Sequence, residues 1–168
     1  YGLSEEQLKK GLATFPGVER RFTYKGITKT KAQVFDDYGH HPKEIAATLE
    51  IAYNKPKNKL IVIFQPHRYT RTHLLWNDFI SLLSSSTIDN VIVTDIYAAH
   101  ESTIDGISSL ELVQAVKKIR PNCNIHYVPY EATHHSLRAH IEPLADHDGV
   151  MLVQGAGPIT GFANSLIE

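Results

Sequence analysis

Seven consecutive residues near the start of the chain combine groups that can bind ligands and transfer protons. The sequence DDYGHHP at residues 36–42 holds two carboxylates, a phenol and two imidazoles, between an apolar strand candidate and a helix candidate that starts at Pro42. In open α/β sheets, ligands bind at such junctions because these lie at the carboxyl ends of strands. A helix N-terminus also favours bound anions. The segment therefore predicts a ligand site; the alternative is that Asp36 or Asp37 only caps the helix and the histidines face solvent.

A second polar segment, QPHRYTR at residues 65–71, follows the apolar run 60–64. Arg68 and Arg71 can each grip a carboxylate or phosphate through two parallel hydrogen bonds, and their i, i+3 spacing lets them converge on one anion. If both preceding runs are parallel strands, the two polar segments lie at the same edge of the sheet. We therefore expect them side by side, facing one solvent-filled cleft; the alternative is a pair of surface arginines on a loop.

Three weaker signals lie elsewhere. Residues 95–97, Asp-Ile-Tyr, follow another strand candidate and could line the same edge, although an aspartate at a strand end often only caps. The glycine-rich segment 155–161 lacks the G-x-G-x-x-G spacing, so it either brings backbone close to a ligand or closes a tight turn. The ten histidines include adjacent pairs, and no H-E-x-x-H or C-x-x-C frame is present. We therefore expect no dedicated metal site.

The elements that must position these segments alternate along the chain. Apolar runs predict strands at residues 32–35, 60–64, 91–95, 125–128 and 150–153. Amphipathic patterns predict helices at residues 42–53, 72–84, 108–119 and 133–141, with a terminal helix through Leu166. Repeated strand–helix units predict an α/β fold with a mostly parallel sheet and helices on both faces.

The N-terminal part departs from this alternation. Residues 1–15 predict an amphipathic helix with capping-box spacing, ended by Pro16 and Gly17. Because the chain opens in mid-pattern, we assign residues 1–16 to the tail of a preceding domain or a linker, and residues 17–168 to one domain. The runs 20–24 and 31–35 then predict a hairpin at the sheet edge. On pattern alone, Arg20 and Arg21 are best explained as solvated charges that discourage edge-to-edge aggregation.

Composition narrows the class of protein. The chain has 168 residues, enough for one sizeable core, and a net charge of −1. That charge gives no overall field for nucleic acid or an anionic membrane, so we expect neither as a partner. The single cysteine, Cys123, excludes an internal disulfide. With no signal-peptide pattern and no long apolar run, a cytoplasmic setting is expected.

Three segments resemble motifs of the Mur ligase family, whose members build the peptidoglycan stem peptide. They are DDYGHHP at residues 36–42, FQPHRYTRT at residues 64–72 and GAG at residues 155–157. Together they are similar to the C-terminal domain of the ligases that join L-alanine to UDP-N-acetylmuramate. The lead-in GVERRF at residues 17–22 is also similar to the start of that domain. The similarity covers nearly the whole chain in the expected order.

The resemblance implies a reaction and a set of roles. Mur ligases have a UDP-sugar domain, a central ATPase domain and a Rossmann-like C-terminal domain that closes over both. With ATP and Mg2+ they activate a substrate carboxylate as an acyl phosphate, which the incoming amine attacks. Residues 1–16 would then be the tail of the central domain. Arg21 and Asp37 would contact the phosphates and the ribose of ATP. The residues around the alanine and its carboxylate would be Tyr38, His40, His67, Arg68 and Arg71, with His40 also as the base for the amine. Pro158 stands where the family commonly has an acidic residue, so no role follows for residues 155–158.

The sequence contains no G-x-x-x-x-G-K-[ST] phosphate loop. Acyl phosphate formation needs a cradle for the β- and γ-phosphates, so we expect this chain alone to be inactive and to act with the other two domains. The alternative is a free-standing Rossmann-type module that binds a nucleotide or another anion. A small hydrolase is a weaker alternative, because no G-x-S-x-G elbow is present.

Overall fold

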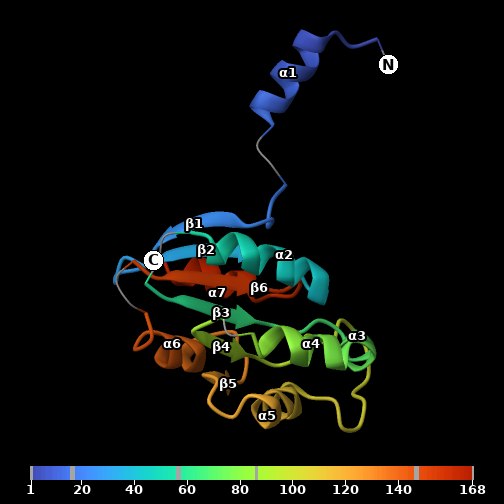
Figure 1. Cartoon of the computed structure of the whole chain (residues 1–168), viewed down its shortest axis with the longest axis vertical. Coiled ribbons are helices and arrows are strands. Elements are labelled where there is room, and N and C mark those ends of the chain that lie inside the picture. Colours follow the sequence, from blue (N-terminus) through green and yellow to red (C-terminus); the bar gives the residue numbers. More distant parts are fainter. Residues whose placement is uncertain (1, 16–17, 56–57, 86, 146–147, 168) are drawn as a thin grey trace.

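The computed structural model describes residues 2–15, 18–55, 58–85, 87–145 and 148–167. Within these residues, one six-stranded sheet has the strand order β1-β2-β6-β3-β4-β5 (Figure 1). The strands are β1 (Thr23–Ile27), β2 (Gln33–Asp37), β3 (Leu60–Phe64), β4 (Asn90–Val93), β5 (Ile125–Tyr127) and β6 (Val150–Gln154). β1 pairs antiparallel with β2, and the other pairings are parallel.

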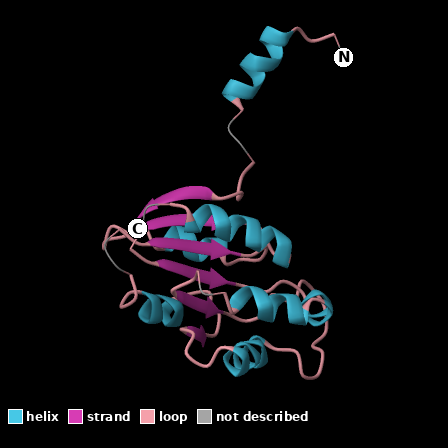
Figure 2. Cartoon of the chain, viewed as in Figure 1, coloured by secondary structure: helices cyan, strands magenta, loops and turns pink. Residues whose placement is uncertain are grey.

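The described residues form seven helices, and those after the first cover both faces of this sheet (Figure 1). They are α1 (Glu5–Thr14), α2 (Pro42–Tyr53), α3 (Tyr69–Leu74), α4 (Trp76–Leu83), α5 (Ser109–Ile119), α6 (His135–Ile141) and α7 (Thr160–Ser165). Figure 2 shows them packed along the twisted sheet, except for α1. The predicted α/β class, the mostly parallel sheet and the edge hairpin are confirmed, although the first strand of the hairpin is Thr23–Ile27 and not residues 20–24.

Two apolar clusters form the core because alternate residues of each buried strand point to opposite faces. On one face, Val62 and Leu152 pack with apolar side chains of α2, α4 and α5. On the other, Ile63 and Val153 pack with side chains of α6 and α7. All five residues of β3 are buried, as its uninterrupted apolar run predicts.

Some boundaries differ from the prediction. The helix expected at residues 72–84 starts earlier, at Tyr69, and is divided at Leu75, whose backbone leaves the helical region (φ −109°, ψ 23°). The apolar pattern does not mark this start, because the first turn carries polar residues that belong to the loop motif. The strand expected at residues 91–95 ends at Val93, where a polar loop begins.

The N-terminal helix stands apart from the sheet (Figure 1). Its predicted capping box is present: the Ser4 hydroxyl accepts from the Gln7 N–H, and the Gln7 side chain accepts from the Ser4 N–H. Leu8 and Leu12 are exposed, and no residue of α1 is buried among those described. The expected boundary at residues 16 and 17 lies outside the described residues. The assignment of residues 1–16 to another domain stays a prediction.

Among the described residues, no helix is both long and apolar enough to cross a membrane.

Candidate functional site

The polar segments meet at the carboxyl edge of the sheet. β2 and β3 both pair in parallel with β6, so that Asp37, Gln154 and Phe64 lie level at the ends of their strands. The loops that follow β2 and β3 therefore leave the sheet side by side. The ring centroids of His40 and His67 lie 5.3 Å apart, which confirms that segments 36–42 and 65–71 are neighbours.

The two adjacent aspartates are structural supports of this edge. The buried Asp37 carboxylate accepts hydrogen bonds from the backbone N–H of Phe22 (2.8 Å) and Gly39 (2.7 Å) and from the Gln154 side chain (2.9 Å). It thereby joins the lead-in of β1, the turn after β2 and the end of β6. In this structure these three protein donors occupy the Asp37 carboxylate. Its contact with the ribose of ATP therefore stays a prediction.

Asp36 points to the opposite face and is 1% exposed. Its Oδ2 accepts from the Thr160 hydroxyl (2.6 Å) and from Arg20 Nε (3.3 Å). Arg20 also donates to the Gly155 carbonyl (2.6 Å), and its guanidinium lies over the Tyr38 ring, 5.0 Å from the centroid. The interpretation of both arginines as solvated edge charges is therefore wrong for Arg20, which ties the segment before β1 to three other parts of the edge.

The adjacent histidines His40 and His41 make different contacts. His41 is the N-cap of α2: its Nδ1 accepts from the Lys43 N–H (3.2 Å), and Glu44 Oε2 accepts from the His41 N–H (3.2 Å). The alternative that Asp36 or Asp37 caps this helix is thus wrong. Because His41 occupies the cap, its neighbour His40 turns toward the loop after β3.

The contact between His40 and the Tyr38 carbonyl determines the tautomer of the His40 ring. His40 Nδ1 lies 3.1 Å from the Tyr38 carbonyl oxygen. A carbonyl can only accept, so Nδ1 carries the ring proton in the neutral form and Nε2 keeps its lone pair. His40 is therefore arranged to accept a proton through Nε2.

His67 has the opposite tautomer. Arg71 Nη1 lies 2.9 Å from His67 Nδ1, and a guanidinium can only donate, so the neutral His67 ring carries its proton on Nε2. Burial lowers the pKa of His67 to about 4, with further contributions from His40, Arg71 and Arg68. At neutral pH this imidazole is a neutral donor that also orients Arg71.

We expect an NMR titration to find His67 neutral until the pH falls to about 4. The unfolded chain binds this proton near pH 6.5, so His67 favours folding above pH 6.5, and the advantage is lost as the pH falls from about 6.5 to about 4. Replacing Arg71 by alanine should raise the pKa of His67, because it removes a nearby positive charge. A midpoint at or above 6.5 in the folded protein would contradict this placement.

A row of rings crosses the edge. Tyr38 contacts His40 (5.4 Å between centroids), His40 contacts His67, and His67 contacts Tyr97 (5.6 Å), which follows β4. Tyr97 is 39% exposed, so the predicted role of residues 95–97 in lining this edge is confirmed for Tyr97. Asp95 instead accepts from the Tyr127 hydroxyl (2.6 Å) and the Tyr130 N–H (2.8 Å), which is a structural role.

The two arginines of the second loop differ in setting. Arg68 is half exposed, and its backbone adopts φ 69°, ψ 137°, a strained conformation for a non-glycine residue that costs about 1–3 kcal/mol. The Arg68 N–H donates to the Tyr97 carbonyl (2.8 Å), which holds this conformation. Arg68 and Arg71 line one hollow of about 310 Å3 with Thr70, Leu74 and Leu75. No residue of segment 36–42 lines this hollow, so the shared cleft stays a prediction.

The glycine-rich loop after β6 is explained by packing. A side chain at Gly155, whose φ is 152°, would meet the Gln65 carbonyl oxygen at 2.8 Å. At Gly157 it would meet the Gln65 side chain at 2.4 Å and the Tyr97 ring at 2.9 Å. The structure thus favours a tight turn over close approach of this backbone to a ligand.

Arg21, predicted to contact phosphate, is exposed, and its charge reaches Glu44 at the start of α2. Arg21 is therefore accessible to an anion at this edge, whereas its neighbour Arg20 is engaged within the domain.

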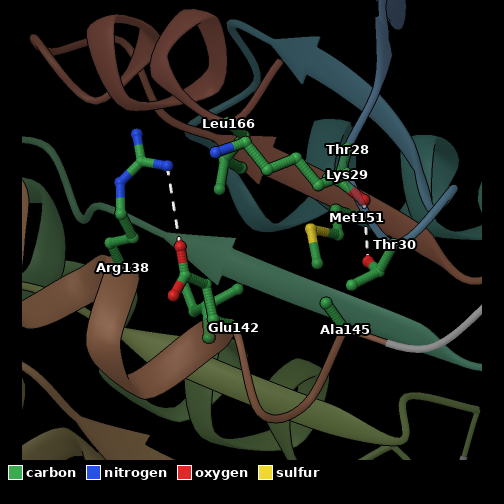
Figure 3. Close-up of a pocket in the computed structure, with 9 residues that line it drawn as sticks. Thr28, Lys29, Thr30, Arg138, Glu142, Ala145, Met151 and Leu166 are labelled. Atoms are coloured by element: carbon green, nitrogen blue, oxygen red, sulfur yellow. Dashed lines mark hydrogen bonds and ion pairs between the residues drawn. The ribbon is translucent and has the colours of Figure 1, made fainter. Parts of the chain in front are cut away.

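Another hollow, of about 320 Å3, lies away from this edge, between the β1–β2 turn and the ends of α6 and α7 (Figure 3). Two cationic side chains line it, Lys29 and Arg138, and Arg138 pairs with Glu142 (3.7 Å) and donates to the Ser165 carbonyl. Because these contacts already engage Arg138, we assign this hollow no role.

No group of three or more His, Cys, Asp or Glu side chains among the described residues is placed to hold a metal ion.

The fold and the edge together define a class of protein: a Rossmann-like α/β domain with arginine, histidine and tyrosine side chains gathered at the carboxyl edge of its sheet. The family model "Mur ligase, glutamate ligase domain" matches residues 20–157, and the chain belongs to the Mur ligase family.

Curated relatives belong to the same family. The UDP-N-acetylmuramate–L-alanine ligase of Lawsonia intracellularis is 43% identical over 160 residues, which is 95% of this chain and 34% of that protein. The ligase of the same name from Mesorhizobium japonicum is 42% identical over 165 residues, 98% of this chain and 34% of that protein. The chain thus spans about a third of the length of the relatives it matches.

Solved structures show the same fold. The UDP-N-acetylmuramate–alanine ligase of Thermotoga maritima superposes with a TM-score of 0.67 at 26% identity, over 98% of this chain and 33% of that one. A murein peptide ligase from Psychrobacter arcticus superposes with a TM-score of 0.72 at 20% identity, over 98% of this chain and 32% of that one. The second likeness is one of fold alone.

Sequence reasoning missed Arg20 and Glu101. Arg20 was grouped with Arg21, and only the tertiary contacts separate them. Glu101 lies far along the chain from the loop it contacts, and its Oε1 accepts from the Thr70 hydroxyl (2.7 Å). No local pattern marks a contact between residues 31 positions apart.

Proposed function

We propose that this chain is the C-terminal domain of an ATP-dependent ligase that joins L-alanine to UDP-N-acetylmuramate in cytoplasmic peptidoglycan precursor synthesis. The observation that carries the proposal is the placement of Arg68 and Arg71 beside the His40–His67 pair at one edge of the sheet. A free amino acid presents a carboxylate and an ammonium group close together, and these side chains offer a complement to each.

The carboxylate of alanine would be held by Arg68 and Arg71. Charge-assisted, forked hydrogen bonds fix the direction of a carboxylate as well as its distance. Arg71 is already oriented by its contact with His67, so less side-chain freedom is lost when the ligand binds. Tyr38 and Tyr97 extend the row of rings on either side and would limit the room for a larger side chain.

His40 would take the proton from the alanine ammonium through Nε2, because its Nδ1 is committed to the Tyr38 carbonyl. The neutral amine then attacks the carbonyl carbon of the acyl phosphate and forms the C–N bond. Inorganic phosphate leaves with the electrons of the C–O bond, and the second amine proton passes to the departing phosphate or to water. Fixing the amine against that carbon can supply roughly 7–11 kcal/mol of barrier reduction.

ATP, its Mg2+ and UDP-N-acetylmuramate would be bound mainly by the N-terminal and central domains of the same enzyme. This chain would add Arg21 toward the ATP phosphates, and Asp37 toward its ribose either directly or by holding the turn after β2. We assign Mg2+ no ligand in this chain. A free-standing nucleotide-binding module, the alternative function, would not require Arg68 and Arg71 beside His40.

The test uses the longer protein that contains this domain. We expect it to release phosphate from ATP only with both L-alanine and UDP-N-acetylmuramate present, while the 168-residue chain alone releases none. Replacing His40 by alanine should lower kcat by roughly 100-fold or more, the usual contribution of a general base, and raise the KM for alanine less.

His41 provides the matched control. Replacing it by asparagine keeps a favourable N-cap for α2 and should leave kcat within about twofold. Turnover without alanine, or near-normal kcat for His40→Ala, would refute the proposed role of this edge.

A further inference from the structure

Glu101 holds the start of the helix that carries both arginines. Its Oε2 accepts from the Thr70 N–H (3.0 Å) and its Oε1 accepts from the Thr70 hydroxyl (2.7 Å). Among the described contacts, the N-cap residue Arg68 supplies no side-chain cap to α3. The first N–H groups of a helix have no partner within the helix, so Glu101 provides the missing cap from another part of the chain.

The segment that carries Glu101 is bent toward α3. The backbone of Tyr97 makes two hydrogen bonds with the loop after β3. Its N–H donates to the Pro66 carbonyl (2.8 Å), and its carbonyl accepts from the Arg68 N–H (2.8 Å). Ala99 and His100 then both adopt positive φ, 48° and 71°, and the Glu101 N–H donates back to the Ala98 carbonyl (3.0 Å). This turn returns Glu101 to the first turn of α3.

Glu101 is also placed to steer Arg68 without occupying it. Glu101 Oε1 lies 3.9 Å from Arg68 Nη1, too far for a hydrogen bond, so the guanidinium fork can still bind a ligand carboxylate. The side chain of Arg68 is 50% exposed and that of Glu101 only 20%. The hydrogen bonds from the Thr70 hydroxyl and N–H lower the pKa of Glu101 below its ordinary value, as expected for bonds that favour the carboxylate.

We propose that Glu101 is a positioning residue for the amino-acid substrate: by clamping Thr70, it fixes the start of α3 so that Arg68 and Arg71 converge on the substrate carboxylate. This inference rests on the proposed function for the identity of the substrate. The clamp itself is a property of the domain and can be tested without substrate.

The first measurement is kinetic, in the full-length ligase. Glu101→Ala is expected to raise the KM for alanine about tenfold, the equivalent of about 1.4 kcal/mol, while the KM for ATP changes less than twofold. Glu101→Gln keeps an oxygen for the Thr70 N–H, and its amide can donate to the Thr70 hydroxyl, so it should restore the KM to within about threefold of wild type. Asp105→Ala removes a carboxylate from an exposed position of the same loop and should change neither constant.

The second measurement is hydrogen exchange of the same full-length proteins without substrate. The amides of the first turn of α3, from Tyr69 to Thr72, should exchange faster in Glu101→Ala than in wild type and Glu101→Gln. A purely structural role would reduce the active fraction and lower kcat without a selective rise in the KM for alanine.

The outcomes separate the two proposals. An unchanged KM for alanine in Glu101→Ala, unchanged exchange at α3, or equal damage from Glu101→Ala and Glu101→Gln would each overturn the positioning role. A wild-type enzyme that shows no alanine-dependent turnover would refute the proposed function, while faster exchange in Glu101→Ala would still establish the clamp.

Discussion

Replacing Arg68 by alanine in the full-length ligase is expected to raise the KM for alanine by roughly 10- to 100-fold, with the KM for ATP nearly unchanged. A hydrogen bond to a charged group contributes about 1.5–3 kcal/mol, which sets this range. Arg68 is half exposed and its nearest carboxylate is 3.9 Å away, so its loss removes a ligand contact without breaking a short internal bond of its side chain. Steady-state kinetics with alanine and ATP varied in turn would measure the effect.

Two variants serve as controls. Arg68→Lys keeps the charge but loses the fork, and should lie between wild type and Arg68→Ala. Lys118→Met removes one positive charge from an exposed position on α5 and should leave both KM values unchanged. If Arg68→Ala and Lys118→Met gave the same KM for alanine, Arg68 would have no part in binding this substrate.

Replacing Arg20 by methionine is expected to lower the free energy of unfolding of the domain by about 3 kcal/mol. Removing one partner of a buried ion pair leaves an uncompensated charge, which typically costs about 3–5 kcal/mol, and the partly exposed Arg20 places this pair at the lower end. Asp36 is 1% exposed, and its Oδ1 has no hydrogen-bond partner among the described residues, so the buried charge depends on the contacts of Arg20 and Thr160 with Oδ2. Urea unfolding of the 168-residue chain would measure the change, provided that wild type unfolds in one cooperative step.

The neighbouring arginine is the matched control. Arg21→Met changes the same type of side chain at an exposed position and should alter stability by no more than about 0.5 kcal/mol. Adding Asp36→Asn to Arg20→Met removes the stranded charge and should recover part of the loss. Equal destabilisation by Arg20→Met and Arg21→Met would show that the Asp36 pair contributes nothing specific.

The sequence predicted the sheet well because its strands are marked by burial. The apolar run at residues 60–64 is β3 to the residue, and the helix predicted to start at Pro42 does start there. The boundary of α3 was missed, because its first turn is held by Glu101 and not by an apolar pattern.

The sequence marked the two polar segments that lie side by side, but it did not separate the roles of neighbouring residues within them. Neighbouring positions in a loop point in different directions, and the tertiary contacts decide which side chain is engaged within the domain and which stays accessible. His40 faces the row of rings because His41 caps α2, and Arg21 is accessible because Arg20 is held by Asp36. Residue type and spacing are the same for both members of each pair, so no local pattern could have separated them.

The place of β6 in the sheet has a consequence for how the domain is made. β6 (Val150–Gln154) comes last among the described strands but lies between β2 and β3, pairing with both. While the chain emerges from the ribosome, β2 and β3 have no contact partner at this position for more than 80 residues after β3 is complete. Until β6 is made, the β1–β2 hairpin and the strands β3, β4 and β5 lack the strand that joins them, and their unpaired edges are open to non-native pairing. Because β6 pairs with both β2 and β3 and so holds the loops after them side by side, we expect a chain that ends before Val150 not to bring His40 and His67 into contact.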